Sequence, residues 1–295
     1  MRISLFYVSL FTLTLLFNSC KNNKQGADKA TLDSIDLGNK EEVMNELDTV
    51  GTGIPIFYNM YLSVELSSLF ESAGAIFSRE ILNSYDKTSD YITSYKKAMN
   101  LGVYAVDLSY CRAFEQFEVA GRYFSAMQNL SEQLGIPQDY FEETSQRFEK
   151  NLTNKDSLIA IANEVYYETE KYLKDNERFA TAAVIIMGGW VEAIYIGTNI
   201  AIDSRNYEIL ERLVDQKYSL NNLLIMLKDY SDNENVKDYI VKLQELRKVF
   251  DSLSVNIPAG FEGKSAAEKA QLDKWIMDVK KLQNAVLKIR KDIVE

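Results

Sequence analysis

The sequence predicts an all-α protein, an irregular bundle of about eight or nine helices that follows a flexible N-terminal tether. From residue 55 to the end, apolar residues recur every three or four positions, a spacing that places them on one face of a helix. Over the same part, no stretch alternates between apolar and polar residues for long enough to indicate a sheet. The composition agrees, because the 295 residues include only three prolines and 13 glycines, the residues least compatible with helix interiors.

The N-terminus has the order of residues that is typical of a secretory signal. Arg2 is followed by an almost unbroken apolar run, which is too short for the roughly 20 apolar residues of a membrane span. The run ends at Phe17-Asn18-Ser19-Cys20, which resembles the lipobox of bacterial lipoproteins, although a strong lipobox has Leu in place of Phe17 and Gly or Ala in place of Ser19. The resemblance implies that Cys20 is acylated and becomes the mature N-terminus. The alternative is a plain secretory signal that leaves Cys20 as a free or paired thiol.

These features divide the chain into three parts. Residues 1–19 are the predicted lipoprotein signal peptide, residues 20–54 the lipidated N-terminus with a polar, flexible tether, and residues 55–295 a single all-α domain. We expect the chain to associate with a membrane through its lipid anchor, as an outer-membrane lipoprotein of the cell envelope. Residues 21–24 carry no acidic cluster of the kind that directs lipoproteins to the cell surface, so the periplasmic face is favoured over the surface.

The helices of the first half of the domain are predicted from their apolar stripes and their breaks. A first helix covers residues 56–73. A long helical stretch over residues 89–134 follows, with Thr88 or Ser89 as its N-cap and a Gly-Ile-Pro turn as its end. Most of its stripe consists of small residues, so another helix can approach it closely. Gly102 lies inside the stretch, where it can bend the helix or break it in two.

Later boundaries are marked by polar breaks and turns. Asn233 ends a Ser-Asp-Asn break and is predicted to be an N-cap. A loop over residues 252–264, which holds Pro258 and Gly260, separates the final amphipathic helix from the rest. The other predicted helices span residues 76–83, 138–151, 155–175, 178–202, 206–229, 234–253 and 265–294.

The composition excludes several classes of function. The chain has no histidine, which removes Ser-His-Asp and Cys-His catalysis, the usual zinc sites and haem ligation by histidine. Its formal net charge of −10 argues against nucleic acid as a partner, because phosphates are bound by basic surfaces. Cys111 lies in an apolar stretch and is predicted to be a small buried hydrophobe rather than a nucleophile. We expect no metal site and no cofactor, and we assign no catalytic residue.

Two nearly uncharged helical segments are the candidates for ligand chemistry. Residues 100–110 contain one acid, Asp107, and residues 182–198 contain one acid, Glu192. A buried carboxylate needs a partner; Arg112 points partly away from Asp107, so a tyrosine hydroxyl or a distant Lys or Arg is an equally good one. The simpler interpretation is structural, with Asp107 fixing the helix register and the glycines of the second segment admitting a neighbouring helix. The candidate ligand-binding residues are Tyr104, Asp107, Tyr110, Trp190, Glu192 and Tyr195.

Three segments carry a resemblance to a known family. They are Gly-Thr-Gly-Ile-Pro at 51–55, Leu-Gly-Val-Tyr-Ala-Val-Asp-Leu-Ser-Tyr at 101–110 and Gly-Gly-Trp-Val-Glu at 188–192. Together they are similar to a family of uncharacterised all-helical Bacteroidetes lipoproteins, and the similarity covers most of the mature chain. The resemblance implies a helical fold and a cell-envelope location, and it brings no known activity or site residues.

These observations leave three hypotheses for the function. The first is a non-enzymatic envelope lipoprotein whose helical domain binds a protein partner or a small ligand. The alternative is a small-ligand sensor with a pocket between the helices at 89–134 and 178–202. The third is a hydrolase that works with carboxylates and tyrosines, which requires two carboxylates that meet in one cleft within about 10 Å.

Overall fold

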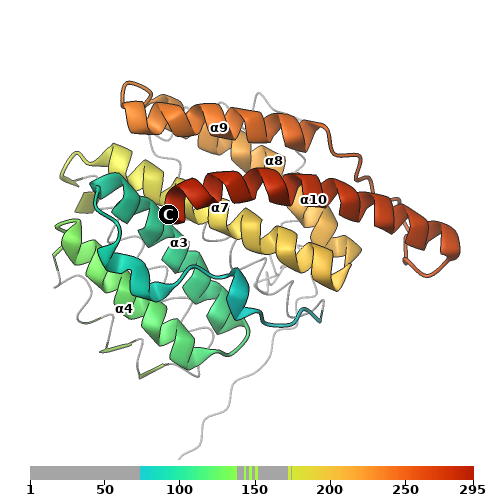
Figure 1. Ribbon diagram of the computed structural model, residues 1–295, viewed down its shortest axis with the longest axis horizontal. Coiled ribbons are helices and arrows are strands. Elements are labelled where there is room, and N and C mark those ends of the chain that lie inside the picture. Colours follow the sequence, from blue (N-terminus) through green and yellow to red (C-terminus); the bar gives the residue numbers. More distant parts are fainter. Residues whose placement is uncertain (1–73, 138–142, 144–145, 148–149, 152–171, 174) are drawn as a thin grey trace, which may run out of the picture. The chain divides into compact units, whose positions relative to one another are not determined.

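The computed structural model describes residues 74–137, 143, 146–147, 150–151, 172–173 and 175–295. Every regular element among these residues is helical, so the predicted all-α fold is confirmed (Figure 1). The predicted signal peptide, Cys20, the tether and the helix at 56–73 lie outside the described residues, as do most of the helices at 138–151 and 155–175. The described elements are the 3-10 helices η2 (Arg79–Ile81) and η3 (Tyr85–Ser89) and the α-helices α3 (Ser94–Ala113), α4 (Phe117–Gln133), α7 (Phe179–Ser204), α8 (Tyr207–Lys228), α9 (Glu234–Asp251) and α10 (Ala266–Val294).

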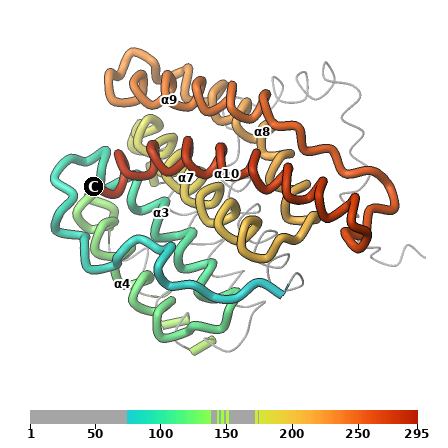
Figure 2. Tube along the Cα trace, turned by 45° about the vertical axis from the view of Figure 1, so that its right-hand side comes forward, coloured from blue at the N-terminus to red at the C-terminus, as the bar shows by residue number. Residues whose placement is uncertain are grey.

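Helix α7 lies at the centre of the described bundle. It contacts α3, α8 and α10, and its most extensive contact is with α3. Figures 1 and 2 show α7 and α10 between the α3–α4 pair on one side and the α8–α9 pair on the other. By length and hydropathy α7 is apolar enough to cross a membrane, but 78% of its apolar window is buried in the fold. This burial is the pattern of a core helix of a globular protein.

Glycines bring α3 and α7 into backbone contact. A Cβ added to Gly102 would lie 2.0 Å from the carbonyl oxygen of Ile185, and one added to Gly188 would lie 2.1 Å from that of Met99. No side chain fits at either position, so the helices touch there without a gap. The close approach of a neighbouring helix, which the small residues predict, is therefore present. At Gly102 and Gly188 no space remains between α3 and α7.

The helical stretch predicted at 89–134 is present as two helices, and the suggested break at Gly102 is wrong. α3 runs unbroken through Gly102, and the chain turns at Glu115, whose φ of 57° lies in the left-handed region. The amide of Gln116 donates to the carbonyl of Cys111, which closes the helix end as in a Schellman-type turn. The N-cap also differs from the prediction: it is Thr93, whose hydroxyl accepts from Lys96, whereas residues 88 and 89 belong to η3.

The predicted helix at 76–83 is also wrong, since only the short η2 forms there. Two of its backbone amides donate to side chains of α3 instead of to helical carbonyls. The amide of Ser78 donates to the hydroxyl of Tyr110 (2.9 Å), and the amide of Asn83 donates to Asp107 (3.2 Å). Long-range side-chain acceptors thus replace the local bonds that the periodicity predicts.

The last three helices begin close to their predicted positions, and each has a side-chain cap. Asn206 caps α8 and Asn233 caps α9. Ser265 and Glu268 form a reciprocal capping box at the start of α10. The prediction for Asn233 is therefore confirmed.

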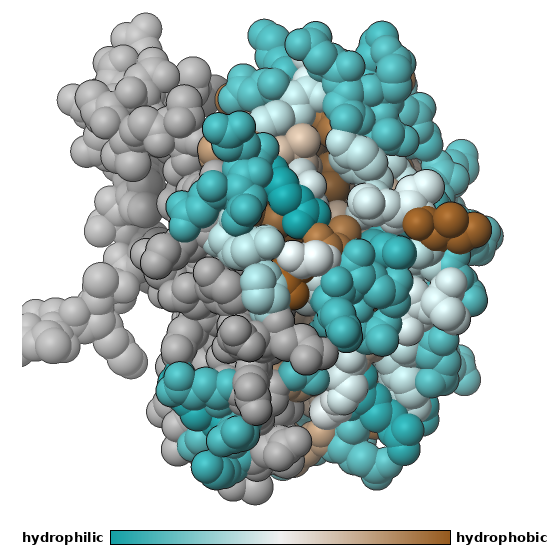
Figure 3. Space-filling model, turned by 90° about the vertical axis from the view of Figure 1, so that its left-hand side faces the viewer, coloured by the Kyte–Doolittle hydropathy of each residue, from teal (hydrophilic) through white to brown (hydrophobic). Residues whose placement is uncertain are grey.

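The face of the described residues seen in Figure 3 is mainly hydrophilic. Figure 3 shows one face on which apolar side chains are visible only at separate places among polar ones. Scattered apolar residues are normal on a protein surface. The exposed large apolar side chains of the described residues are Ile76, Ile92, Phe179, Tyr218, Ile225, Val241 and Met277.

Candidate functional site

A buried ion pair joins α7 to α10. Glu192 is fully buried, and Arg290 binds it with two hydrogen bonds, from Nε to Oε2 (2.6 Å) and from Nη2 to Oε1 (2.7 Å). Nη2 also donates to the carbonyl of Ile81 (3.1 Å), and the guanidinium carbon lies 4.2 Å from the ring centroid of Tyr195. This paired, planar arrangement is the strong form of a charge-assisted hydrogen bond. The guanidinium is therefore held in one position.

Asp107 of α3 is the second carboxyl of this cluster. It is fully buried, its Oδ2 accepts from the amide of Asn83, and its Oδ1 has no hydrogen-bond partner among the described atoms. Burial and the nearby charge of Glu192 raise the pKa of Asp107 well above its usual value, against the opposing effect of Arg290. A proton retained on Asp107 removes its charge, so the cluster then holds one negative and one positive charge. We call these three residues the core cluster.

The retained proton predicts a specific pH dependence for Asp107→Asn. The unfolded Asp107 ionises near pH 3.8, whereas the folded one keeps its proton to higher pH, so rising pH favours the unfolded chain. Each pH unit between the two pKa values costs wild type about 1.4 kcal/mol of stability. Asn has the shape of the protonated acid and cannot ionise. We expect the stability of Asp107→Asn relative to wild type, measured by urea unfolding at several pH values above 4, to increase as the pH rises. If the stabilities of wild type and Asp107→Asn instead change in parallel with pH, Asp107 does not retain a proton in the folded protein.

A network of neutral polar groups surrounds the core cluster. Asn83 donates to Asn100 Oδ1 (3.1 Å), and its carbonyl accepts from the Tyr123 hydroxyl (2.6 Å). The Tyr104 hydroxyl donates to the carbonyl of Ser84 (2.7 Å). These hydrogen bonds therefore connect the segment between η2 and η3 to α3 and α4. Each of these hydrogen bonds pairs a polar group that would otherwise be buried without a partner.

The reactive groups near the cluster are held in their protonated forms. Burial raises the pKa values of the Tyr104 and Tyr123 hydroxyls, so neither is a base at neutral pH. Burial likewise raises the pKa of the Cys111 thiol, in agreement with its predicted role as a buried hydrophobe. In the described part of the chain, no three Cys, Asp or Glu side chains gather as a metal site would require.

The structure brings some of the six candidate residues together and separates others. Asp107, Glu192 and Tyr195 meet at the core cluster, and Tyr104 lies in the adjoining network. Tyr110 instead accepts from Ser78 and stacks on Phe77, with ring centroids 5.3 Å apart. Trp190 donates to the Ser219 hydroxyl of α8 (2.8 Å) and does not join the cluster. All except Tyr195 are buried, so the candidates face the core.

Sequence reasoning missed Arg290, Asn83 and Asn100. Arg290 carried a usable signal, because it interrupts an apolar face: it follows Ile289 and lies four residues after Val286, and both are buried. An arginine at such a position needs a buried partner. The two asparagines carried no comparable signal, since Asn is common in loops and on helix surfaces.

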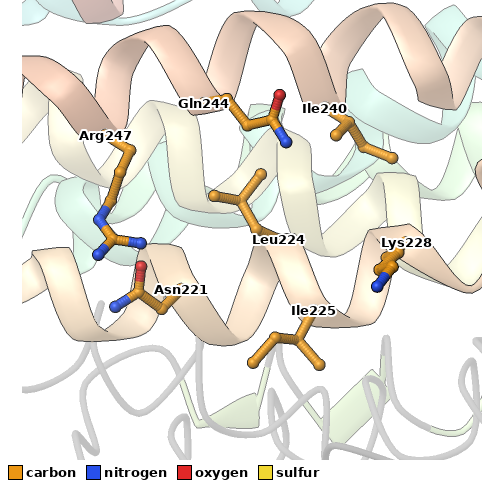
Figure 4. A pocket seen from close by; sticks show the side chains of 7 residues that line it. All are labelled: Asn221, Leu224, Ile225, Lys228, Ile240, Gln244 and Arg247. Carbon is orange, nitrogen blue, oxygen red and sulfur yellow. The ribbon is translucent and has the colours of Figure 1, made fainter.

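A surface groove between α8 and α9 is a second candidate site. It has a volume of about 480 Å³ and an almost wholly apolar lining. Figure 4 shows Asn221 and Arg247 at one end of the groove, and Leu224 and Ile225 of α8 with Gln244 of α9 in its middle. Ile240 of α9 and Lys228 of α8 lie at the other end. Unlike the core cluster, this groove is open to solvent.

The two candidate sites differ in accessibility and in chemistry. The core cluster consists of buried ionisable groups, whereas the groove is open to solvent and its lining combines apolar side chains with Lys228 and Arg247. The predicted similarity to Bacteroidetes lipoproteins rests on the sequence segments alone. Comparison with models of protein families, with curated proteins and with solved structures finds no match to this chain.

Proposed function

We propose that this protein is a cell-envelope lipoprotein whose all-α domain is a non-enzymatic interaction module. Acylated Cys20 anchors it in the outer membrane, on the periplasmic face, and the polar tether allows the domain to reach a partner. The observation that supports a binding role best is the groove between α8 and α9. It exposes apolar side chains to solvent next to the positively charged side chains of Lys228 and Arg247. A concave, mainly apolar lining with a few polar groups at its ends is typical of binding sites.

The alternative of a carboxylate hydrolase is less well supported. Such an enzyme needs two carboxylates that reach the same substrate. Asp107 and Glu192 do come together, but both side chains are fully buried and Glu192 is bound to Arg290 at both oxygens. A substrate would have to displace that ion pair from the core, at the cost of leaving a buried charge unpaired.

Site-specific photocrosslinking in cells tests the interaction role. A benzoylphenylalanine placed one at a time at five exposed apolar positions of the full chain samples different surfaces of the fold. We expect a discrete adduct at one patch and none at the others. Absence of adducts at every position, with the protein present and folded, would contradict the proposal. The positions are Ile76, Ile92, Ile225, Val241 and Met277.

The lipid anchor gives a separate prediction for Cys20→Ala. The wild-type chain should label with palmitate and partition into the detergent phase, because two or three acyl chains give stable anchoring at about 0.8 kcal/mol per buried methylene. Cys20→Ala should lose both the label and the partitioning. Cys111→Ala is the matched control, and it should keep both. A Cys20→Ala protein that still carries acyl mass would disprove the anchor.

A further inference from the structure

We propose that the groove between α8 and α9 binds an amphipathic helix of a partner protein that carries an acidic residue at each end of a short apolar stripe, two helical turns apart. The inference rests on the proposed interaction function and names its surface and its class of partner. It is carried by the shape of the groove and by the two cations at its ends.

The apolar part of the groove is suited to an apolar stripe. Leu224 and Ile240 are half-buried, and Ile225 is 51% exposed. Tyr218 lies seven residues before Ile225, on the same side of α8, and is 43% exposed. Exposed apolar side chains therefore extend over at least two turns of α8, which is the length that an apolar face of a short helix covers.

The ends of the groove supply positive charge in a chain of net charge −10. Asn221 and Arg247 mark one end and Lys228 the other, as Figure 4 shows. Asn221 and Lys228 are seven residues apart on α8, a rise of about 10.5 Å. Lys228 has no ion-pair partner within the described residues, and Arg247 approaches Asp251 at 3.5 Å in an exposed pair, a kind of contact that contributes little. Acidic residues at i and i+7 of a bound helix reach both cations.

A helix fits this surface better than an extended peptide does. Strand addition needs free backbone amides and carbonyls, and the backbone groups in the middle of α8 and α9 bond within their own helices. The groove therefore offers only side chains, arranged as two parallel rows. Rows of this kind accept the i, i+3, i+4 and i+7 positions of a third helix.

Two synthetic helical peptides provide the probe. Both have Leu at i+3 and i+4; one has Glu at i and i+7, and the other has Lys there. We expect the full wild-type chain to bind the Glu peptide at least tenfold more tightly in fluorescence anisotropy. Lys228→Glu with Arg247→Glu should reverse that preference. The matched control, Lys237→Glu with Lys248→Glu, makes the same charge change on α9 outside the groove and should leave the preference as in wild type.

The outcomes separate the groove from the wider function. Ile225→Ser, a change at an exposed position, should weaken both peptides whatever their charge. Equal affinity of the wild-type chain for the two peptides would overturn the inference. So would a reversed peptide preference in the control variant. Binding of the chain to phosphatidylglycerol vesicles that the Glu peptide does not displace would also overturn it. In the crosslinking experiment, an adduct at Met277 and none at Ile225 would contradict helix binding in the groove but would still agree with the interaction function. The absence of adducts at all five positions would contradict the interaction function itself.

Discussion

Arg290→Met is expected to destabilise the protein by about 3–5 kcal/mol at pH 7, because it leaves the fully buried carboxylate of Glu192 without its counter-charge. Methionine keeps most of the side-chain volume, so the loss reports on charge rather than on a cavity. Urea unfolding at pH 7 measures this loss.

Two further variants control this experiment. Glu192→Leu combined with Arg290→Met removes both charges and should recover much of the lost stability, since a buried ion pair can be replaced by apolar residues at little cost. Arg122→Met removes the cation of the exposed pair with Glu118 and should change stability by no more than about 0.5 kcal/mol. If Arg290→Met proves as mild as Arg122→Met, the core cluster is not holding α7 to α10.

Gly188→Ala is the second change with a large expected effect. The added methyl would lie 2.1 Å from the backbone oxygen of Met99, and a backbone cannot rotate away as a side chain does. The two helices must separate, and we expect a loss of about 3 kcal/mol or more. The expected result opposes helix propensity, which favours Ala over Gly by about 1 kcal/mol.

Gly121→Ala in α4 is the matched control. A Cβ at Gly121 meets nothing within 4 Å, so propensity alone acts and the variant should be more stable than wild type by up to about 1 kcal/mol. Opposite signs for the two substitutions in thermal or urea unfolding would confirm the contact between α3 and α7. A neutral or stabilising Gly188→Ala would mean that the two helices are farther apart.

The helical fold and its later boundaries follow from local features that a sequence displays. Helix α7 was predictable because an almost uncharged segment of that length needs to be surrounded by other helices. The cap at Asn233 was predictable because its side chain acts on an amide two residues away. Both features depend on neighbours in the chain, and both are present.

Features that depend on distant partners were not predictable in the same way. The break at Glu115 uses a left-handed residue that is not glycine, so no sequence signal marked it. The loss of helix around Asn83 follows from an acceptor on Asp107, 24 residues away. The core cluster was half predictable: Asp107 and Glu192 stood out as lone acids, but nothing local showed that they meet each other and Arg290.

The central claim is that the core cluster stabilises the fold while binding takes place at the surface. The most direct test compares photocrosslinking yield at position 225 in two variants that keep the wild-type circular dichroism spectrum. Asp107→Asn should give the wild-type yield, and Lys228→Glu with Arg247→Glu should abolish it. A folded Asp107→Asn protein that loses the adduct would contradict the claim and would favour a ligand site between α3 and α7.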